Sequence, residues 1–254
     1  MTFDLEKIVT GKKVIVDSSF IQRTFGAHIP ILLYEGKWQS VNPEDINTTI
    51  SSVNELNQLV KHGHDIGITG EVKREVLEYL RLLNNHKEYF GSSHEQKGNK
   101  SKRNFKRNRT RSEWVEDAPE TFGEYTLLCD LIFNLSKRIP IISLDKHVLQ
   151  SEDYARISGL TRTFGKKRQE WRERNGIYKE GERNLKHKIE LGQALSTDQK
   201  ISSMGIMFAY NSPVLVLTQD NDVYSIIGNT LRSMSSIGDI SLPQNSIMIY
   251  GIRF

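Results

Sequence analysis

A chain of 254 residues, 37% of them hydrophobic, is long enough for one large α/β domain with a substantial core. Its single cysteine, Cys129, excludes an internal disulfide and a multi-cysteine metal site, which suits a reducing cytoplasm. The first residues form neither a basic nor an apolar segment, and no apolar run approaches the length of a membrane helix. We therefore expect a soluble cytoplasmic protein that does not engage a membrane.

The net charge of +4 conceals two strongly basic tracts. Residues 97–111 contain eight Lys or Arg and no acid, and residues 162–188 contain ten against four Glu. The rest of the chain is left with 17 basic and 27 acidic residues, a net charge of −10. A basic appendage on an acidic body predicts a polyanionic partner.

The first expected strand is the run Val-Ile-Val at residues 14–16, which places Asp17 at its carboxyl end with Ser18 behind it. The alternative is that Asp17 or Ser18 only caps the helix that follows. Residues 42–60 have the apolar spacing of an amphipathic helix.

A second short strand is expected within residues 64–71, and Glu71 follows it in the first turn of a helix whose apolar positions continue to Leu83. The helix dipole alone would also favour an acid at this position. His62 and His64 precede the strand, and we interpret them as loop residues because no cysteine or third histidine nearby completes a metal site.

The hydrophobic periodicity is lost over residues 84–118, where Asn, Lys, Arg, Gly and Ser dominate, so we expect a long basic loop insertion there. Residues 119–138 return to a buried helix. A further strand is expected at 140–143, followed by a helix over 144–159 that ends at a glycine.

A second insertion is expected over residues 161–195, where Trp171 and Tyr178 lie among arginines in an arrangement that suits stacking on unpaired bases. The alternative is a solvated charged helix supported by pairs four residues apart. We expect the two insertions to contact nucleic acid through Lys100, Lys102, Arg103, Lys106, Arg107, Arg109, Arg111, Lys166, Lys167, Arg168, Trp171, Arg172 and Arg174.

A helix begins near residue 196 with Thr197 as its expected N-cap, Asp198 in its first turn and Gly205 allowing close packing on the sheet. Residues 213–218 then form a buried strand that ends at Thr-Gln-Asp-Asn-Asp. Two carboxylates at alternate positions beyond a parallel strand predict a divalent cation, whereas an Asx-rich turn is the structural alternative. A helix over 223–231 and a strand at 246–250 close the fold.

Four of these acids stand at positions that converge on one edge of a doubly wound parallel sheet. Buried together they would repel one another strongly unless cations neutralised them, so the grouping predicts one or two Mg²⁺ or Mn²⁺ ions held by oxygen ligands. The four acids, which we take as the catalytic residues, are Asp17, Glu71, Asp198 and Asp220.

These residues lie in four motifs, Val-Ile-Val-Asp17-Ser-Ser, Ile-Thr-Gly-Glu71, Asp198-x-x-Ile-x-x-x-Gly-Ile-x-Phe-Ala209 and Val-Leu-Thr218-x-Asp220-x-Asp222. In this order they resemble the PIN domain family of metal-dependent nucleases, and the last two motifs are the most specific. The resemblance covers about 13–83, 119–160 and 196–252 of a single domain spanning residues 1–254, while 84–118 and 161–195 look like insertions.

The resemblance implies a three-layer α/β/α sandwich with a central parallel sheet and an acidic site that binds Mg²⁺ or Mn²⁺. It also implies endonucleolytic hydrolysis of phosphodiester bonds, with RNA favoured over DNA, in which a divalent ion activates water and stabilises charge on the phosphate. By position, Asp222 takes the place of an additional metal-binding acid, and Thr218 and Ser18 those of auxiliary hydroxyls.

Two other interpretations stay open. In the first, the PIN-like fold has lost its activity and the basic tracts make the protein a nucleic-acid-binding or assembly module, which leaves a homodimer or another protein partner open. In the second, the protein is a phosphatase with an aspartyl nucleophile, although Asp17 is followed by Ser-Ser rather than by the second acid that such an enzyme would need.

Overall fold

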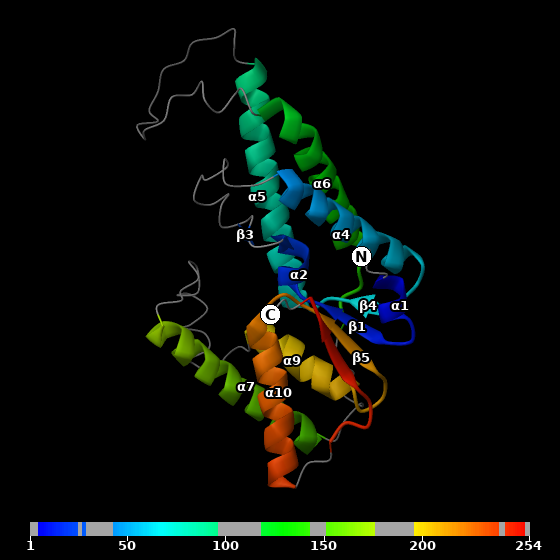
Figure 1. Ribbon diagram of the computed structural model, residues 1–254, viewed down its shortest axis with the longest axis vertical. Coiled ribbons are helices and arrows are strands. Elements are labelled where there is room, and N and C mark those ends of the chain that lie inside the picture. The colour runs from blue at the N-terminus through cyan, green and yellow to red at the C-terminus, as the bar shows by residue number, and fades with distance from the viewer. Residues whose placement is uncertain are drawn as a thin grey trace. The chain divides into compact units, whose positions relative to one another are not determined.

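The computed structural model describes residues 5–24, 27–28, 43–95, 118–142, 151–175, 196–238 and 242–251. Within these residues it contains eight helices, a four-stranded parallel sheet and a two-stranded antiparallel sheet (Figure 1). The expected α/β class with a parallel sheet is confirmed. Among the residues described, no helix combines the length and the apolar character needed to cross a membrane.

The chain forms two compact units. The first consists of Met1–Phe20, Gly63–Lys73 and Pro140–Phe254, and the second of Ile21–His62 and Arg74–Ile139. The parallel sheet belongs to the first unit, together with every acidic and hydroxyl residue that we expected at its edge.

The sheet of the first unit has the strand order β4-β1-β5-β6, and all neighbouring pairs are parallel. β1 and β5 lie at its centre, and their apolar side chains are buried. Parallel strands are covered on both faces, which explains why uninterrupted apolar runs predicted them correctly. The four strands are β4 (Ile66–Gly67), β1 (Lys13–Val16), β5 (Val214–Leu217) and β6 (Ile247–Tyr250).

The strand expected at 140–143 is confirmed only as a shorter pairing in the residues described there. Over 140–142 the chain makes a single parallel bridge, between Ile141 and Ile68 just beyond β4. Gly67 permits this approach, because an added Cβ would lie 2.6 Å from Cγ2 of Ile142.

Helix α9 (Thr197–Phe208) packs on β1 and β5. Its N-cap is Ser196 rather than the expected Thr197: the Ser196 hydroxyl accepts from the backbone of Gln199, whose side chain accepts in return from the Ser196 backbone. This reciprocal pair is a capping box. Gly205 faces the sheet as expected, but an added Cβ would make an ordinary 3.4 Å contact with Val216, so glycine is not required there.

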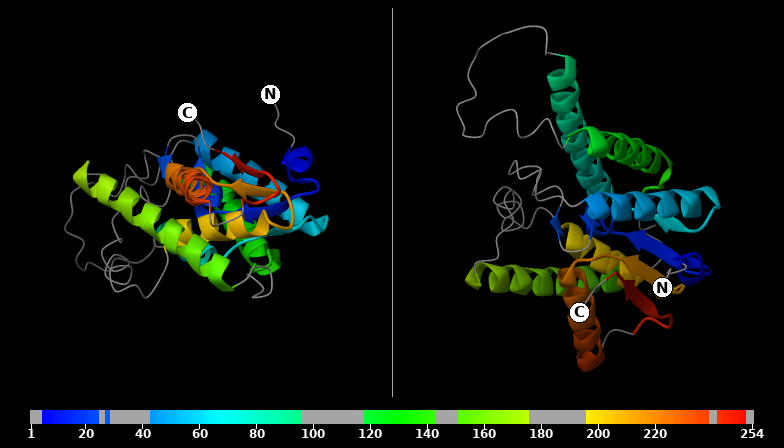
Figure 2. Two further views of the ribbon diagram at one scale, coloured as in Figure 1. Left: turned by 90° about the horizontal axis from the view of Figure 1, so that it is seen from below. Right: turned by 45° about the horizontal axis from the view of Figure 1, so that its top comes forward.

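Helix α7 (Ser151–Arg174) packs against α9 and α10 (Asn221–Ile237), as both views of Figure 2 show. It runs straight through Gly159, where we had expected a helix to end, and through the first part of the expected insertion 161–195. The charged helix left open as an alternative is therefore correct up to Arg174, and residues 176–195 lie outside those described.

The residues on the buried side of α7 explain why this helix was not recognised in the sequence. That side includes Ile157, Thr161 and Gly165, spaced four residues apart. The Thr161 hydroxyl lies 2.6 Å from that of Ser203 on α9. Because this contact uses small and polar residues, the helix lacks the strong apolar period by which helices are recognised. The short α1 (Leu5–Val9) also belongs to the described part of the first unit.

In the second unit, α4 (Pro43–Lys61) packs against α6 (Ala118–Arg138), and both helices lie where the sequence predicted them. Asn57 of α4 donates a 3.0 Å hydrogen bond to the carbonyl of Leu131 on α6. The small antiparallel sheet of this unit pairs β2 (Arg23–Thr24) with β3 (Ala27–His28).

Two helices contribute residues to both units, α2 (Ser18–Gln22) and α5 (Gly70–Glu95). Glu71 lies in the first turn of α5, as predicted. The helix continues to Glu95, so residues 84–95 of the expected loop are helical instead, and residues 96–117 are not among those described.

Candidate metal centre

Asp17 lies at the carboxyl end of β1 and is 2% exposed. Its Oδ2 accepts hydrogen bonds from the hydroxyls of Thr218, at 2.8 Å, and of Ser19, while the Ser18 hydroxyl lies 3.5 Å from Oδ1. A buried carboxylate needs such donors, because its lone pairs are cut off from water. Ser19 is therefore a site residue that we missed in favour of Ser18.

Thr218 and Ser19 connect the ends of the two central strands. Their hydroxyl oxygens lie 3.1 Å apart. Thr218 Oγ1 also accepts from the backbone NH of Asp220 at 2.9 Å, and Ser19 Oγ accepts from that of Gln219 at 3.0 Å. The hydroxyls thus hold the chain immediately after β5 against Asp17.

Three carboxylates come together beside this network. Asp198, in the first turn of α9, and Asp220 and Asp222, which follow β5, place one oxygen each within 4.8 Å of one another. Asp222 and Asp220 are buried, whereas Asp198 is half-buried. The chain therefore gathers three of the five expected metal ligands from two separate segments.

Asp220 also has the structural role that we gave as an alternative. It is the N-cap of α10, and its Oδ1 accepts a 2.9 Å hydrogen bond from the backbone NH of Asp222. This bond fixes the Asp220 carboxylate relative to Asp222, so capping the helix and assembling the acidic cluster are consistent with each other.

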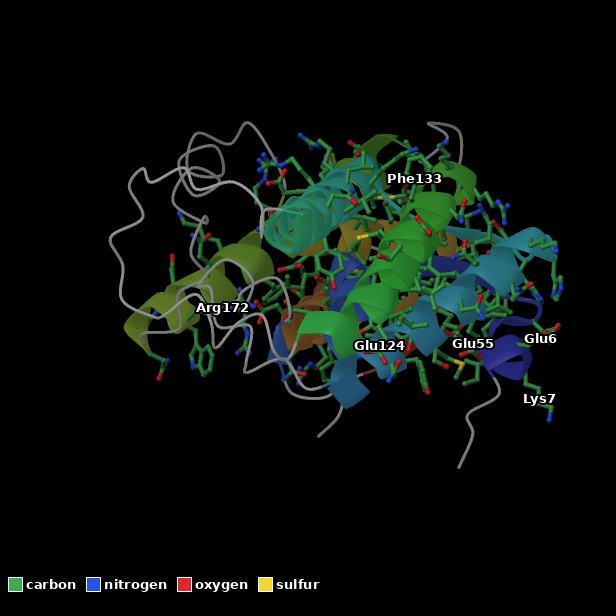
Figure 3. All side chains as sticks on the ribbon, turned by 90° about the horizontal axis from the view of Figure 1, so that it is seen from above. Glu6, Lys7, Glu55, Glu124, Phe133 and Arg172 are labelled. Carbon is green, nitrogen blue, oxygen red and sulfur yellow. The ribbon has the colours of Figure 1, made fainter. Side chains whose placement is uncertain are left out.

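Two arginines of α7 contact this cluster. Arg168 Nε donates to Asp222 Oδ1 at 2.6 Å, and Arg172 donates to Asp222 Oδ2 and lies 3.4 Å from Asp220 Oδ1. Arg172, labelled on α7 in Figure 3, has a side chain only 14% exposed. We had assigned both arginines to nucleic acid, but in this structure their guanidinium groups pair with acids of the same unit.

The sequence signal that points to this pairing is helical spacing. Positions 157, 161 and 165 form the buried side of α7, and positions 168 and 172 extend the same side by steps of three and four residues. Net charge counts carry no such directional information, which is why they assigned every basic residue of the tract to one role.

The other two expected ligands are not part of the three-carboxylate cluster. Asp17 is connected to it through Thr218, whose hydroxyl contacts both the Asp17 carboxylate and the Asp220 backbone. Glu71 instead forms an ion pair with Lys200, which lies in the first turn of α9 and was absent from our expected site. Each outlying acid therefore has a protein partner of its own.

The remaining basic residues described on α7 face solvent. Lys166 and Lys167 are exposed, the Arg174 side chain is 77% exposed, and Trp171 is 44% exposed with the Arg168 guanidinium 4.2 Å from its ring centroid. The expected nucleic-acid contacts of the first insertion lie outside the described residues: Lys100, Lys102, Arg103, Lys106, Arg107, Arg109 and Arg111.

The donor atoms of the cluster fit a hard divalent cation. All three are carboxylate oxygens, the ligands that Mg²⁺ and Mn²⁺ prefer, and no sulfur or imidazole is among them. They lie just beyond the carboxyl end of β5, the edge of a parallel sheet at which ligands bind. The fold and the cluster thus define an α/β protein with a candidate cation site at its sheet edge. Comparison of the chain with family models, curated proteins and solved structures finds no match.

Proposed function

We propose that this protein is a divalent-metal-dependent nuclease with a PIN-like α/β/α sandwich fold, acting as an endoribonuclease in the cytoplasm. The observation that carries the proposal is the convergence of Asp198, Asp220 and Asp222, whose oxygens lie within 4.8 Å of one another. Their position at the carboxyl edge of a parallel sheet supports it.

In this proposal the cluster of Asp198, Asp220 and Asp222 holds Mg²⁺ or Mn²⁺. Such an ion would supply a Lewis acid for the scissile phosphate and lower the pKa of a water molecule. The contribution of the chain is to hold the carboxylates ready: the N-cap bond fixes Asp220, and the hydroxyls of Thr218 and Ser19 orient the neighbouring Asp17.

Substrate binding is assigned to the exposed side of α7. Lys166, Lys167 and Arg174 present cations that can neutralise phosphates. Trp171 offers an exposed indole beside them, and aromatic side chains stack on unpaired bases. Sequence-specific recognition by stacking is typical of single-stranded RNA, which supports RNA over duplex DNA as the substrate.

The test compares wild type with Asp220→Asn on labelled single- and double-stranded RNA and DNA, in Mn²⁺ or in EDTA. We expect wild type to cleave single-stranded RNA only with Mn²⁺, and the variant to lose at least about a hundredfold in rate, because mutation of residues that merely support metal ligands already costs about 10–100-fold. Asp130→Asn is the matched control, because Asp130 is an exposed acid of α6. Equal cleavage by wild type and Asp220→Asn would contradict the proposal.

A second candidate function is a nucleic-acid-binding module without activity. The observation that favours it is that several of the acids already have cationic partners, Asp222 with Arg168 and Arg172, and Glu71 with Lys200. This candidate predicts that RNA binds equally well with and without Mn²⁺ and is never cleaved, a result that the same assay would record.

A further inference from the structure

Arg168 and Arg172, the cationic partners of the acidic cluster, lie on α7, and contacts away from the cluster fix the position of this helix. Gly165 lies against Gln199 of the α9 capping box, so closely that an added Cβ would be 2.7 Å from the Gln199 Cδ. The hydroxyls of Thr161 and Ser203 add a 2.6 Å contact one turn earlier. These contacts fix α7 on α9, and the next turns of α7 then bring Arg168 and Arg172 to the cluster.

The arginine contacts use the atoms that a cation would need. Asp222 accepts from Arg168 through Oδ1 and from Arg172 through Oδ2, so both of its oxygens are engaged. Arg172 also lies 3.4 Å from Asp220 Oδ1. A divalent ion among the same oxygens would be held within a few ångströms of two positive guanidinium groups, in a region where both aspartates are buried and screening is weak.

We propose that Arg168 and Arg172 are internal counter-ions of the acidic cluster, and that a divalent cation binds by displacing them from Asp220 and Asp222. The inference rests on the proposed metal site. Removing a charge partner from a buried carboxylate is costly unless another cation takes its place. The arginines and the divalent ion therefore cannot occupy the aspartates together, but each can neutralise them when the other is absent.

The exchange would give the displaced arginines a second role. A guanidinium group carries five donors in a planar fork that matches phosphate oxygens. Arg168 already lies beside the exposed Trp171 and near Lys167 in sequence, so a guanidinium leaving Asp222 would enter the basic surface of α7 assigned to the substrate. Metal binding and phosphate binding would thereby be coupled through the same two side chains.

The experiment measures Mn²⁺ binding to the full chain by the loss of the free-ion paramagnetic resonance signal. We expect Arg168→Gln/Arg172→Gln to bind Mn²⁺ about tenfold more tightly than wild type, a coupling of ordinary size between competing ligands. Arg156→Gln/Arg162→Gln is the matched control, because it removes two arginines from the exposed side of α7, apart from the residues assigned to the substrate, and should leave the affinity near the wild-type value. Unchanged or weaker binding by the arginine variant would overturn the inference.

The variant Asp220→Asn distinguishes a failure of the counter-ion inference from a failure of the proposed function. If Asp220→Asn loses Mn²⁺ binding while the arginine variant binds as wild type does, the metal site stands and the counter-ion role is wrong. If wild type and Asp220→Asn bind equally, or neither wild type nor the arginine variant binds, the metal site itself is wrong, and the inference falls with it.

A second measurement leaves both arginines in place, so it remains informative even if the double variant does not fold. The chain has three tryptophans, and Trp38→Phe/Trp114→Phe leaves Trp171 as the only one. Because the Arg168 guanidinium lies over the Trp171 ring, we expect Mg²⁺ to change the fluorescence emission of Trp171. The midpoint of this change should occur at the same Mg²⁺ concentration as the midpoint of metal binding. Constant emission through saturation with Mg²⁺ would contradict the displacement of Arg168.

Discussion

The Asp17 carboxylate shows how a buried charge is maintained at the edge of a sheet. It receives hydroxyl hydrogen bonds from Thr218 and Ser19, while its own backbone NH donates to the carbonyl of Leu217 at 2.9 Å. Hydrogen bonds to charged groups are stronger than those between neutral groups, and their loss in a buried position leaves the charge poorly solvated. The Thr218 hydroxyl makes two such contacts, because it also accepts a hydrogen bond from the backbone NH of Asp220.

At this scale we predict that Thr218→Val destabilises the fold by about 1–3 kcal/mol, because valine matches the shape of threonine but removes both hydrogen bonds. Urea unfolding measures the change. The control is Thr163→Val on the exposed side of α7, which should stay within about 0.5 kcal/mol of wild type. A Thr218→Val protein as stable as wild type would mean that the hydroxyl contributes little to holding Asp17.

At the scale of elements, Gly165 is the position at which α7 meets the start of α9. An added Cβ would lie 2.5 Å from Cγ of Gln199, which is itself 2% exposed and cannot move aside into water. Gly159, six residues earlier in the same helix, has nothing within 4 Å of an added Cβ. The two glycines of α7 therefore have opposite environments.

We predict opposite signs for the two alanine substitutions. Gly165→Ala should destabilise the protein by about 1–3 kcal/mol through overpacking and displacement of Gln199 from the capping box. Gly159→Ala should stabilise it by about 0.5–1 kcal/mol, because alanine is the better helix former. Thermal or urea unfolding of both variants measures the change in stability. Equal changes at the two positions would show that α7 does not pack closely on α9.

The strands and α7 also show what sequence reasoning could and could not predict. Runs such as Val-Leu-Val-Leu in β5 stand out because both faces of a parallel strand are buried. Asp17, Asp220 and Asp222 followed directly from the ends of those strands, whereas Asp198 was placed from the first turn of the helix before β5. The orientation of α7 did not follow, since its buried side has a threonine and a glycine, and the partners of its arginines depend on which helix it packs against. Ser196 and Thr197 are both good caps, and only the fold decides between them.

At the scale of the whole molecule, the first unit is assembled from three separate stretches of chain. β1 pairs with β4 on one side and with β5 on the other, although β5 comes almost at the end of the sequence. The acidic cluster also comes from the late part of the sequence, because its members follow β5 or lie on α9, the helix that precedes β5. Contacts so distant in sequence favour slow folding.

The hydrogen bond from Thr218 to Asp17 spans 201 residues, so it has a consequence for the chain during its synthesis. At about 5–20 residues per second, a ribosome needs about 10–40 s to reach β5 after β1 has emerged. Throughout that interval the Val-Ile-Val run of β1 has only the short β4 as a partner, and the nascent chain exposes an apolar edge that chaperones and proteases recognise. Stalled nascent chains should therefore stay protease-sensitive in the first unit when they end before residue 210, and become resistant once β5 and β6 have left the ribosome.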